Sequence, residues 1–427
     1  MSMTRKLYRM AALVALVPFA ACSDILSLDV EAPGRIRDED LNIAGAMPGI
    51  AAGAQYNLTN AFDAVTFQTS MAAKDLGYGG SYGYDNTALG IFKYDVEDWG
   101  EYTTMSRARW TAEHGLMRMK EVLGATQYEK DVSVAKAYLL AGIANRLLGE
   151  TQCRVNFDEL VDGEYVAGPD RPHTDAFVRA DSQFTRAIAV GTAAGSNAAD
   201  IVTAAYGGRA SVRAWMGQWD AAVADAAKVP TTFMWNTTFS STSTNYIWVE
   251  TNSRREYSVY GSYWENIDDD PRVPWEYTTA KGQDGQTPFY HQLKYATNDA
   301  DIPITHGAEM RVLQAERALR QSPPDYAAAQ TYLNQARAKW NLAAITLPTN
   351  PTDAWATLRH ERYATTWLEG RKIWDWRRWS VEPEAYKKDP EATGRDLCWP
   401  ISQGEQRANP NIKVGEGGQW GGCPTCG

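Results

Sequence analysis

The chain has 427 residues, enough for two or three domains or for one large domain, and 44% of them are hydrophobic, which is ample for a core. Its formal net charge is −10, and this acidity argues against a nucleic-acid partner because phosphate binding relies on clustered Lys and Arg. The 16 Trp and 22 Tyr exceed what a core requires. Such rigid, amphipathic rings at a surface suit protein interfaces or stacking on sugars.

The N-terminus has the layout of a secretory leader. Three basic residues precede an apolar stretch that is too short to cross a bilayer of about 30 Å. Small residues stand directly before Cys22, which resembles a bacterial lipobox and implies cleavage before Cys22 and lipidation of its thiol. Residues 1–21 are therefore expected to be a lipoprotein signal peptide and residues 22–36 a lipidated tether. An ordinary signal peptide followed by an unmodified cysteine is the alternative.

Four further cysteines would lie in an oxidising envelope compartment, where disulfides persist. They are Cys153, Cys398, Cys423 and Cys426, and the sequence does not choose among their three possible pairings. The last two have the spacing of a redox or zinc motif. Zinc needs about four ligands, and no His or further Cys lies near them in sequence, so a disulfide that staples the tail is preferred.

Helical periodicity alternates with an irregular, aromatic segment in the first half of the chain. Helices are predicted over about 41–60, 105–123, 134–148 and 174–190, with Gly149 as a candidate C-cap and Thr174 as a candidate N-cap. Residues 67–102 have no helical period and are rich in Gly and Tyr. Long irregular segments in compact domains are often functional, and the aromatic content argues against disorder.

Two helix pairs are predicted further along, over 204–229 and 308–341. Their second helices begin at Trp219 and Tyr326, each followed by Ala three residues later, a pattern typical of tetratricopeptide-like units. The spacing is not a regular 34 residues, so we expect a degenerate helical scaffold over about 105–230 and 306–380. Simple four-helix packing is the alternative.

The segment between the two helix pairs is a second irregular, aromatic zone, over about 231–305. Some alternation predicts short strands around 245–250. The acidic runs at 268–270 and 298–301 offer oxygen ligands for calcium, although solvated turns are the preferred interpretation.

Motifs for catalysis are absent from the sequence. His360 and Glu361 lack the second histidine of a zinc-protease helix, and the five histidines are scattered without ligand spacing. A glycosidase pair needs two carboxyl groups about 5–10 Å apart in space, which a sequence cannot exclude. We therefore expect no enzyme activity, no cofactor and no metal, with a carbohydrate-active enzyme as one rival.

The stretch 358–380 holds four tryptophans among charges of both signs. A helical period continues through it and predicts one late helix packed into the body of the protein. Arg362 and Glu369 are seven residues apart, about 10 Å along a helix axis, so each is expected to pair elsewhere. A buried ion network is predicted to fix this helix to the scaffold. Its expected structural residues are Glu361, Arg362, Glu369, Gly370 and Asp375.

This stretch resembles the late signature of the SusD/RagB family, E-R-x-x-x-x-x-x-E-G-x-[RK]-x-x-D-x-x-R-W. The residues that fit are Glu361, Arg362, Glu369, Gly370, Trp374, Asp375, Arg378 and Trp379. Thr365 and Lys372 depart from the usual glutamate and arginine. Further segments follow in the family's order: Asp270-Pro271-Arg272, Lys294-Tyr295, Ile302-Pro303-Ile304, Trp399-Pro400-Ile401 and Asn409-Pro410. The departures indicate a divergent member.

The resemblance implies a mostly α fold over 37–427, with tetratricopeptide-like hairpins, long irregular loops and a few short strands. It implies a surface lipoprotein of the outer membrane, anchored through Cys22, that passes a captured oligosaccharide to a SusC-like TonB-dependent transporter. The family places its ligand site in the two irregular zones. We hypothesise these ligand contacts: Asp75, Tyr78, Tyr82, Tyr84, Asn86, Trp99, Tyr260, Tyr263 and Trp264. A peptide ligand and a structural envelope adaptor are further alternatives.

Overall fold

The computed structural model describes residues 37–81, 101–267 and 269–412. Its contacts divide the chain into a short unit, Met1–Ile43, and a large unit, Ala44–Gly427. The described part of the short unit holds one 3-10 turn, η1 (Asp38–Leu41). The expected signal peptide and tether lie outside the described residues, as do Tyr82, Tyr84, Asn86, Trp99, Cys423 and Cys426.

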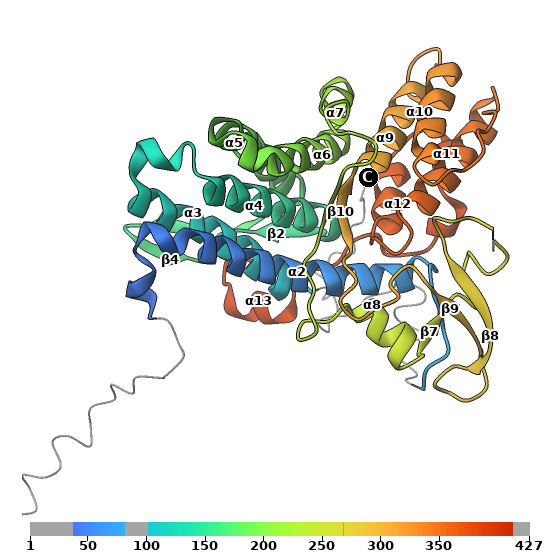
Figure 1. Ribbon diagram of the computed structural model, residues 1–427, viewed down its shortest axis with the longest axis horizontal. Helices are drawn as coiled ribbons and strands as arrows, with labels where there is room; N and C mark the ends of the chain where they lie inside the picture. Colours follow the sequence, from blue (N-terminus) through green and yellow to red (C-terminus); the bar gives the residue numbers. More distant parts are fainter. Residues whose placement is uncertain (1–36, 82–100, 268, 413–427) are drawn as a thin grey trace, which may run out of the picture. The chain divides into compact units, whose positions relative to one another are not determined.

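A first set of helices runs through the N-terminal half of the large unit (Figure 1). It comprises η2 (Ala44–Ala46), α2 (Met47–Ala72), α3 (Tyr102–Tyr128), α4 (Val132–Thr151), α5 (Thr174–Ala194), η4 (Ser196–Ala198), α6 (Ala199–Trp215) and α7 (Trp219–Ala226). Each of α3 to α6 packs against the next α-helix in sequence, and α2 packs against α3 and α4. Short connections make such neighbours antiparallel, so the predicted helical-hairpin scaffold is confirmed.

A second set of helices follows the irregular middle segment. It comprises α9 (Gly307–Leu319), α10 (Tyr326–Ala338), α11 (Pro351–Thr365), α12 (Lys372–Ser380), η6 (Ala385–Lys387), η7 (Pro390–Ala392) and α13 (Gln403–Ala408). The helix pair α9–α10 and the earlier pair α6–α7 begin their second helices at Tyr326 and Trp219, as the sequence predicted. Helix α9 packs against α7, α10 and α11 and so joins the two sets.

Strands are short and lie between the helices. They are β1 (Gly77–Tyr78), β2 (Arg154–Asn156), β3 (Glu159–Val161), β4 (Glu164–Val166), β5 (Asp170–Pro172), β6 (Met234–Asn236), β7 (Tyr257–Ser258), β8 (Trp275–Lys281), β9 (Pro288–Gln292) and β10 (Pro303–His306). In the described part of the chain they form five two-stranded antiparallel sheets, β1–β7, β2–β5, β3–β4, β6–β10 and β8–β9. The expectation of a mostly α fold with a few short strands is confirmed.

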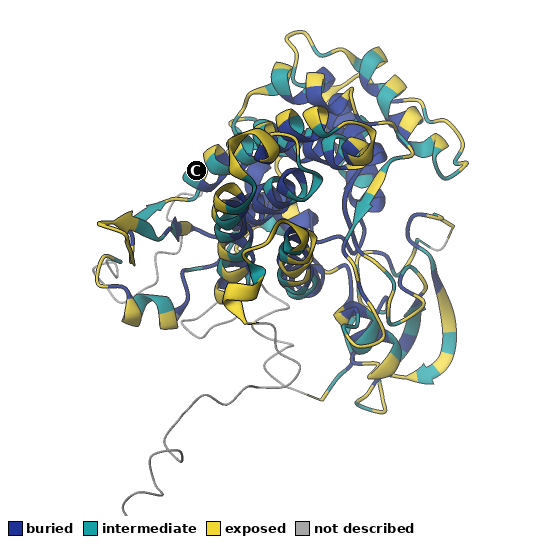
Figure 2. Ribbon diagram, turned by 60° about the vertical axis from the view of Figure 1, so that its left-hand side comes forward, coloured by how far each residue is buried: buried dark blue, intermediate teal, exposed yellow. Residues whose placement is uncertain are grey.

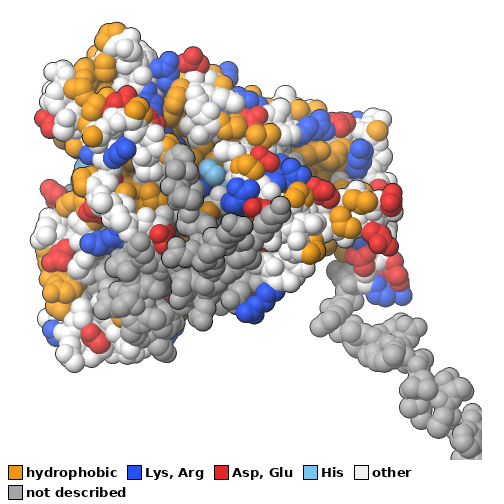
Figure 3. All heavy atoms as spheres, turned by 180° about the vertical axis from the view of Figure 1, so that it is seen from behind, with side chains coloured by type: hydrophobic (Ala, Val, Ile, Leu, Met, Phe, Trp, Pro, Cys, Tyr) orange, Lys and Arg blue, Asp and Glu red, His pale blue; other side chains and the backbone are white. Residues whose placement is uncertain are grey.

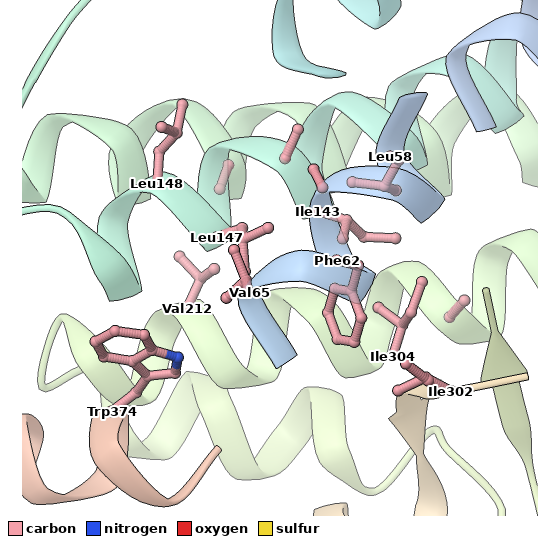
Figure 4. Close-up of a cluster of buried hydrophobic side chains, with 14 of the residues drawn as sticks. Leu58, Phe62, Val65, Ile143, Leu147, Leu148, Val212, Ile302, Ile304 and Trp374 are labelled. Carbon is pink, nitrogen blue, oxygen red and sulfur yellow. The ribbon is translucent and has the colours of Figure 1, made fainter. Parts of the chain in front are cut away.

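The core lies where the helices meet (Figure 2). In Figure 4, apolar side chains of α2, α4 and α6 form one cluster with Trp374 of α12, with Ile302 just before β10 and with Ile304 in β10. Two glycines allow the helices to approach closely. A Cβ on Gly142 or Gly208 would stand 2.7 or 2.4 Å from the ring of Phe184, so this ring fills the space that the missing side chains leave.

The predicted single late helix is wrong, because the chain breaks between α11 and α12. Leu368 and Gly370 have positive φ angles of 55° and 67°. Carbonyl groups in the break accept bonds from outside: Lys294 donates to the Trp367 carbonyl and Tyr295 donates to the Leu368 carbonyl. A Cβ on Gly370 would lie 3.0 Å from the backbone of Thr66. Tertiary contacts therefore replace the helical bonds that the local pattern favoured.

Three other local predictions are corrected. Helix α2 continues to Ala72, so the first irregular zone begins at residue 73 and not at 67. Gly149 lies inside α4, where a Cβ would clash with the ring of Phe177, and it is no cap. Thr174 is the first residue of α5, but no side-chain cap bond forms there.

The strands expected around 245–250 are replaced by helical turns, α8 (Tyr246–Trp248) and η5 (Val249–Ser253). Asn245 explains the difference, because its side chain accepts a bond from the Trp248 backbone N–H and caps the turn.

Of the possible cysteine pairings, the structure forms Cys153–Cys398. The bond joins Cys153, the second residue after α4, to Cys398 in the C-terminal segment, and 245 positions separate the two cysteines. Backbone bonds flank it, since the Cys153 N–H donates to the Trp399 carbonyl and the Trp399 N–H donates to the Thr151 carbonyl. The C-terminal segment is thus held to the scaffold covalently as well as by hydrogen bonds.

Candidate ligand-binding site

The two irregular zones meet in one small sheet. Strand β1 pairs with β7, with Gly77 opposite Ser258 and Tyr78 opposite Tyr257. The pairing requires a glycine, because a Cβ on Gly77 would stand 1.9 Å from the Tyr260 carbonyl oxygen. Segments about 180 residues apart in sequence therefore form one sheet, in which β7 is buried and the half-buried β1 lies toward the surface.

The hairpin β8–β9 extends this surface. The Val259 N–H donates to the Tyr290 carbonyl at 3.0 Å, which ties the hairpin to the chain just after β7. On the other side, the Asp284 N–H in the hairpin turn donates to the Gly79 carbonyl at 3.0 Å. The hairpin is thus attached to both irregular zones.

Four rings form what we call the hairpin aromatic cluster: Tyr260, Trp275, Tyr277 and Tyr290. Tyr277 lies opposite Tyr290 in the register, and Trp275 is two residues before Tyr277, so these three share one face of the hairpin. Trp275 stacks on Tyr290 with centroids 5.4 Å apart, and Tyr260 meets Tyr290 edge-on at 5.2 Å. Tyr277 is 60% exposed, so the cluster has an open ring supported by buried Trp275 and half-buried Tyr260 and Tyr290.

Tyr263 is a second partly open ring, 37% exposed. Its backbone N–H donates to the Lys74 carbonyl at 2.9 Å, and its ring meets the Trp264 ring edge-on at 4.9 Å. Behind it, the Lys372 ammonium lies 4.4 Å from the ring centroid.

Asp75 and Trp264 do not face solvent, contrary to the hypothesis that they contact the ligand. Trp264 is fully buried and Asp75 is 4% exposed, and the indole N–H donates to the Asp75 carboxylate at 3.0 Å. Burial raises the pKa of Asp75, and the charge of Lys372 opposes that rise. The two side chains form the wall behind Tyr263.

Tyr78 is half-buried and leans on Tyr257, with ring centroids 5.1 Å apart. Gly80 lies against the Tyr78 ring, where a Cβ would be 2.5 Å from a ring carbon. Ser81 follows, and its hydroxyl and N–H both donate to the Gln283 side-chain carbonyl at 2.9 and 3.0 Å. Exposed polar groups therefore border the rings, an arrangement that suits hydroxyl-rich ligands.

Solved structures from Bacteroides share this architecture. A SusD-like protein from Bacteroides fragilis NCTC 9343 matches with a TM-score of 0.66 at 13% identity, covering 90% of this chain and 98% of that one. A SusD superfamily protein from Bacteroides thetaiotaomicron VPI-5482 gives 0.65 at 15% identity, with 88% and 99% covered. The chain has the SusD-like fold.

A SusD-like carbohydrate-binding protein from Bacteroides vulgatus ATCC 8482 is also similar in structure, with a TM-score of 0.59 at 14% identity and coverage of 87% of this chain and 97% of that one. Comparison of sequences alone gives a different result. No protein-family model matches the chain, and none of the curated proteins matches it. The likeness to SusD-like proteins thus lies in the arrangement of the elements.

Within the SusD-like fold, the break between α11 and α12 contacts the wall behind Tyr263 through Trp367 and holds buried charges of its own. The Trp367 indole N–H points at the Asp75 carbonyl at 3.4 Å. Glu369 accepts from the Lys294 ammonium at 2.8 Å and contacts His306 at 2.9 Å. Although burial opposes ionisation, the charge of Lys294 lowers the pKa of Glu369 to about 2. The charge of Glu369 is therefore held by partners outside the late helices.

The other ionic residues of the late segment pair with the scaffold. Arg362 is bonded to Asp375 at 2.8 Å and lies 3.0 Å from Glu309. Glu361 receives bonds from Arg272 and Arg337. Arg362 and Glu369 thus have separate partners.

Sequence reasoning missed three members of the hairpin aromatic cluster, Trp275, Tyr277 and Tyr290. A signal was present: aromatic residues stand on both sides of Asp284-Gly285, a dipeptide typical of hairpin turns, and Trp275 and Tyr277 alternate with polar residues before it. The SusD-like fold places these rings beside Tyr260, which the sequence analysis did select.

Two side chains of the acidic runs considered for calcium have other partners, and Asp268 lies outside the described residues. Asp270 is bonded to Arg272, and Asp301 accepts from the Phe239 N–H at 2.9 Å. Within 37–81, 101–267 and 269–412, no three His, Cys, Asp or Glu side chains gather as metal ligands would. In those same ranges, no helix has both the length and the apolar character needed to cross a bilayer.

One face of the described structure carries charges of both signs. Seen from behind, Lys and Arg side chains lie interspersed with Asp and Glu over that face (Figure 3). A nucleic-acid-binding face carries a concentrated basic patch instead.

Proposed function

We propose that the chain is a divergent member of the SusD family that binds oligosaccharides and passes them to a SusC-like TonB-dependent transporter. The observation that carries this proposal is the pairing of β1 with β7, which joins two distant aromatic segments in one face. Sugar rings present C–H faces that stack on aromatic rings, and hydroxyl groups that bond to polar side chains. Tyr263 and the hairpin aromatic cluster offer rings for stacking, and Ser81 and Gln283 offer polar side chains for the hydroxyl groups.

Capture and delivery need no covalent chemistry. The ligand would bind to the open rings, and a difference in affinity between two states of the complex with the transporter would drive release. The carbohydrate-binding neighbour from Bacteroides vulgatus supports a glycan ligand in preference to a peptide.

The direct test is binding of a panel of oligosaccharides by isothermal titration calorimetry. Tyr263→Ala and Tyr277→Ala are expected to weaken binding about tenfold or more each, as for an aromatic anchor worth about 1.4 kcal/mol. Their melting temperatures should stay near that of the unmodified protein, because both rings are partly exposed. Tyr56→Ala, which removes an equally exposed ring from α2, is the matched control and should bind normally.

Binding that survives both site substitutions would reject this face as the ligand site. A reducing-sugar assay on the same panel distinguishes binding from hydrolysis. Release of reducing ends by the purified protein would favour the carbohydrate-active enzyme over the capture protein.

Anchoring at the outer membrane, with the protein on the cell surface, is a separate part of the proposal. The anchor rests on the lipobox-like residues before Cys22, and the location at the surface of the outer membrane rests on the resemblance to the SusD/RagB family. Cys22→Ser should move the protein from the membrane fraction to the soluble fraction and abolish labelling with a radioactive fatty acid. Unchanged membrane association of Cys22→Ser would contradict the anchor.

A further inference from the structure

Lys372 is a buried lysine at the first position of α12, with 2% of its side chain exposed. Its ammonium donates to the Ala73 carbonyl at 2.9 Å. Two carboxylates, Asp75 and Glu391, each lie 3.6 Å away. The cation is therefore compensated, but these ion pairs are longer than a good charge-assisted hydrogen bond.

Three aromatic rings surround the same ammonium. The centroids of Tyr263, Tyr363 and Trp376 lie 4.4, 5.2 and 5.5 Å from the Lys372 nitrogen. All three distances are within the range of attraction between a cation and a ring face, which is strongest at desolvated sites. The shortest distance is the one to Tyr263.

The three rings differ in what else holds them. Tyr363 donates to the Asp389 carboxylate at 2.6 Å, and the Trp376 indole N–H donates to the Tyr363 hydroxyl at 3.0 Å. Both rings are buried. Tyr263 alone among the three is partly open to solvent, with Lys372 on its inner side.

Lys372 also acts on the wall behind Tyr263. The Asp75 carboxylate oxygen that lies 3.6 Å from the ammonium also accepts the bond from the Trp264 indole. The Trp264 ring in turn meets Tyr263 edge-on. One buried cation thus contacts the Tyr263 ring directly and reaches it again through Asp75 and Trp264.

We propose that Lys372 is a positioning residue of the ligand-binding face: its ammonium, enclosed by Tyr263, Tyr363 and Trp376, holds the Tyr263 ring in the orientation that a ligand meets. The effect on ligand affinity rests on the proposed function, whereas the effect on the ring does not.

The orientation of the Tyr263 ring is tested without any ligand. A fluorinated tyrosine is placed at position 263 of the full chain, and its 19F NMR signal is recorded. Lys372→Met, which keeps the apolar stem and removes the charge, should shift and broaden that signal. Lys372→Arg keeps a cation and should preserve more of the unmodified signal than Lys372→Met, even if the larger group lowers the melting temperature.

Lys294→Met is the matched control. Lys294 is a second largely buried lysine in the same junction, where its ammonium bonds to Glu369 and to the Trp367 carbonyl. This substitution should destabilise the protein but leave the signal at position 263 in place. A signal in Lys372→Met that equals the unmodified one, or that changes equally in Lys294→Met, would overturn the positioning role.

Affinity is then measured for an oligosaccharide that the unmodified protein binds. Lys372→Met should weaken binding about tenfold, and should add no loss when Tyr263→Ala is already present, because both changes act through one ring. Additive losses would overturn the link to the ligand. If the unmodified protein binds no member of the panel, the proposed function fails, while the 19F signal still decides the role of Lys372.

Discussion

The indole N–H of Trp264 donates to the Asp75 carboxylate at 3.0 Å, although 189 residues separate the two in sequence. Both side chains are buried, and Lys372 lies 3.6 Å from the same carboxylate oxygen. This bond joins the two irregular zones behind the exposed rings. Trp264 and Asp75 therefore hold the ligand face in place.

Trp264→Ala is expected to destabilise the protein by about 3–5 kcal/mol, because it leaves a cavity and removes a hydrogen bond to the buried Asp75 carboxylate. Urea denaturation measures the loss. Tyr277→Ala, at an exposed position, should change stability by no more than about 0.5 kcal/mol. A Trp264→Ala protein with unchanged stability and lost glycan binding would show instead that the indole reaches the ligand.

Arg362→Ala should cost about 3–5 kcal/mol, because it leaves the buried carboxylates of Asp375 and Glu309 without a cation that they now share. Arg186→Ala provides the comparison, since it removes an exposed pair with Glu129 and should cost at most about 1 kcal/mol. Chemical denaturation of the three proteins gives these differences.

Ligand affinity of Arg362→Ala, measured where the variant is folded, should equal that of the unmodified protein. An unchanged melting temperature together with weakened binding would contradict the structural role of Arg362.

Reduction of Cys153–Cys398 is expected to destabilise the protein by about 2–5 kcal/mol, because the bond closes a loop with a sequence separation of 245. A Cys153→Ser, Cys398→Ser protein should have the same urea midpoint with and without dithiothreitol. In Cys423→Ser, Cys426→Ser the midpoint should still fall on reduction. If the urea midpoint of the unmodified protein is the same with and without dithiothreitol, the bond has no stabilising role.

Local signals explain why the helical scaffold could be predicted. In each helix pair, the start of the second helix is marked by an aromatic residue followed by Ala three positions later. These aromatic residues are Trp219 and Tyr326, and α7 and α10 begin at them. The break before α12 gives no such signal. The helical period runs on through Gly370 and Ile373, and the residues that capture the carbonyls, Lys294 and Tyr295, come from more than 70 positions away.

The same distinction applies to the site. The sequence identified both aromatic zones, and the structure pairs them through β1 and β7. It could not show which rings face outward. Trp264 and Tyr263 are adjacent in sequence, yet Trp264 is fully buried and Tyr263 is 37% exposed. The difference arises because the buried Asp75 carboxylate accepts a hydrogen bond from the Trp264 indole.

We expect Asp63 to make the stability of the folded protein depend on pH. Its carboxylate accepts from the Tyr246 N–H at 3.0 Å and so links α2 to α8. Burial raises the pKa of Asp63 to about 7, although the bond from Tyr246 opposes the rise. In the unfolded chain its pKa is about 3.9. Between about pH 4 and pH 7 the folded state thus holds a proton that the unfolded state has lost, so stability falls as pH rises through this window.

Asp63→Asn keeps the acceptor for Tyr246 and removes the titration. We expect this variant to match the unmodified protein near pH 4 and to exceed it near pH 8 by on the order of 1–3 kcal/mol, less than the full pKa shift would give because the residue is only partly buried. Urea denaturation across this pH range measures the difference. Asn60→Ala, in the same helix, should shift stability by one constant amount at every pH. A gap between Asp63→Asn and the unmodified protein that stays constant or narrows with rising pH would show that the Asp63 carboxyl is not the group that titrates.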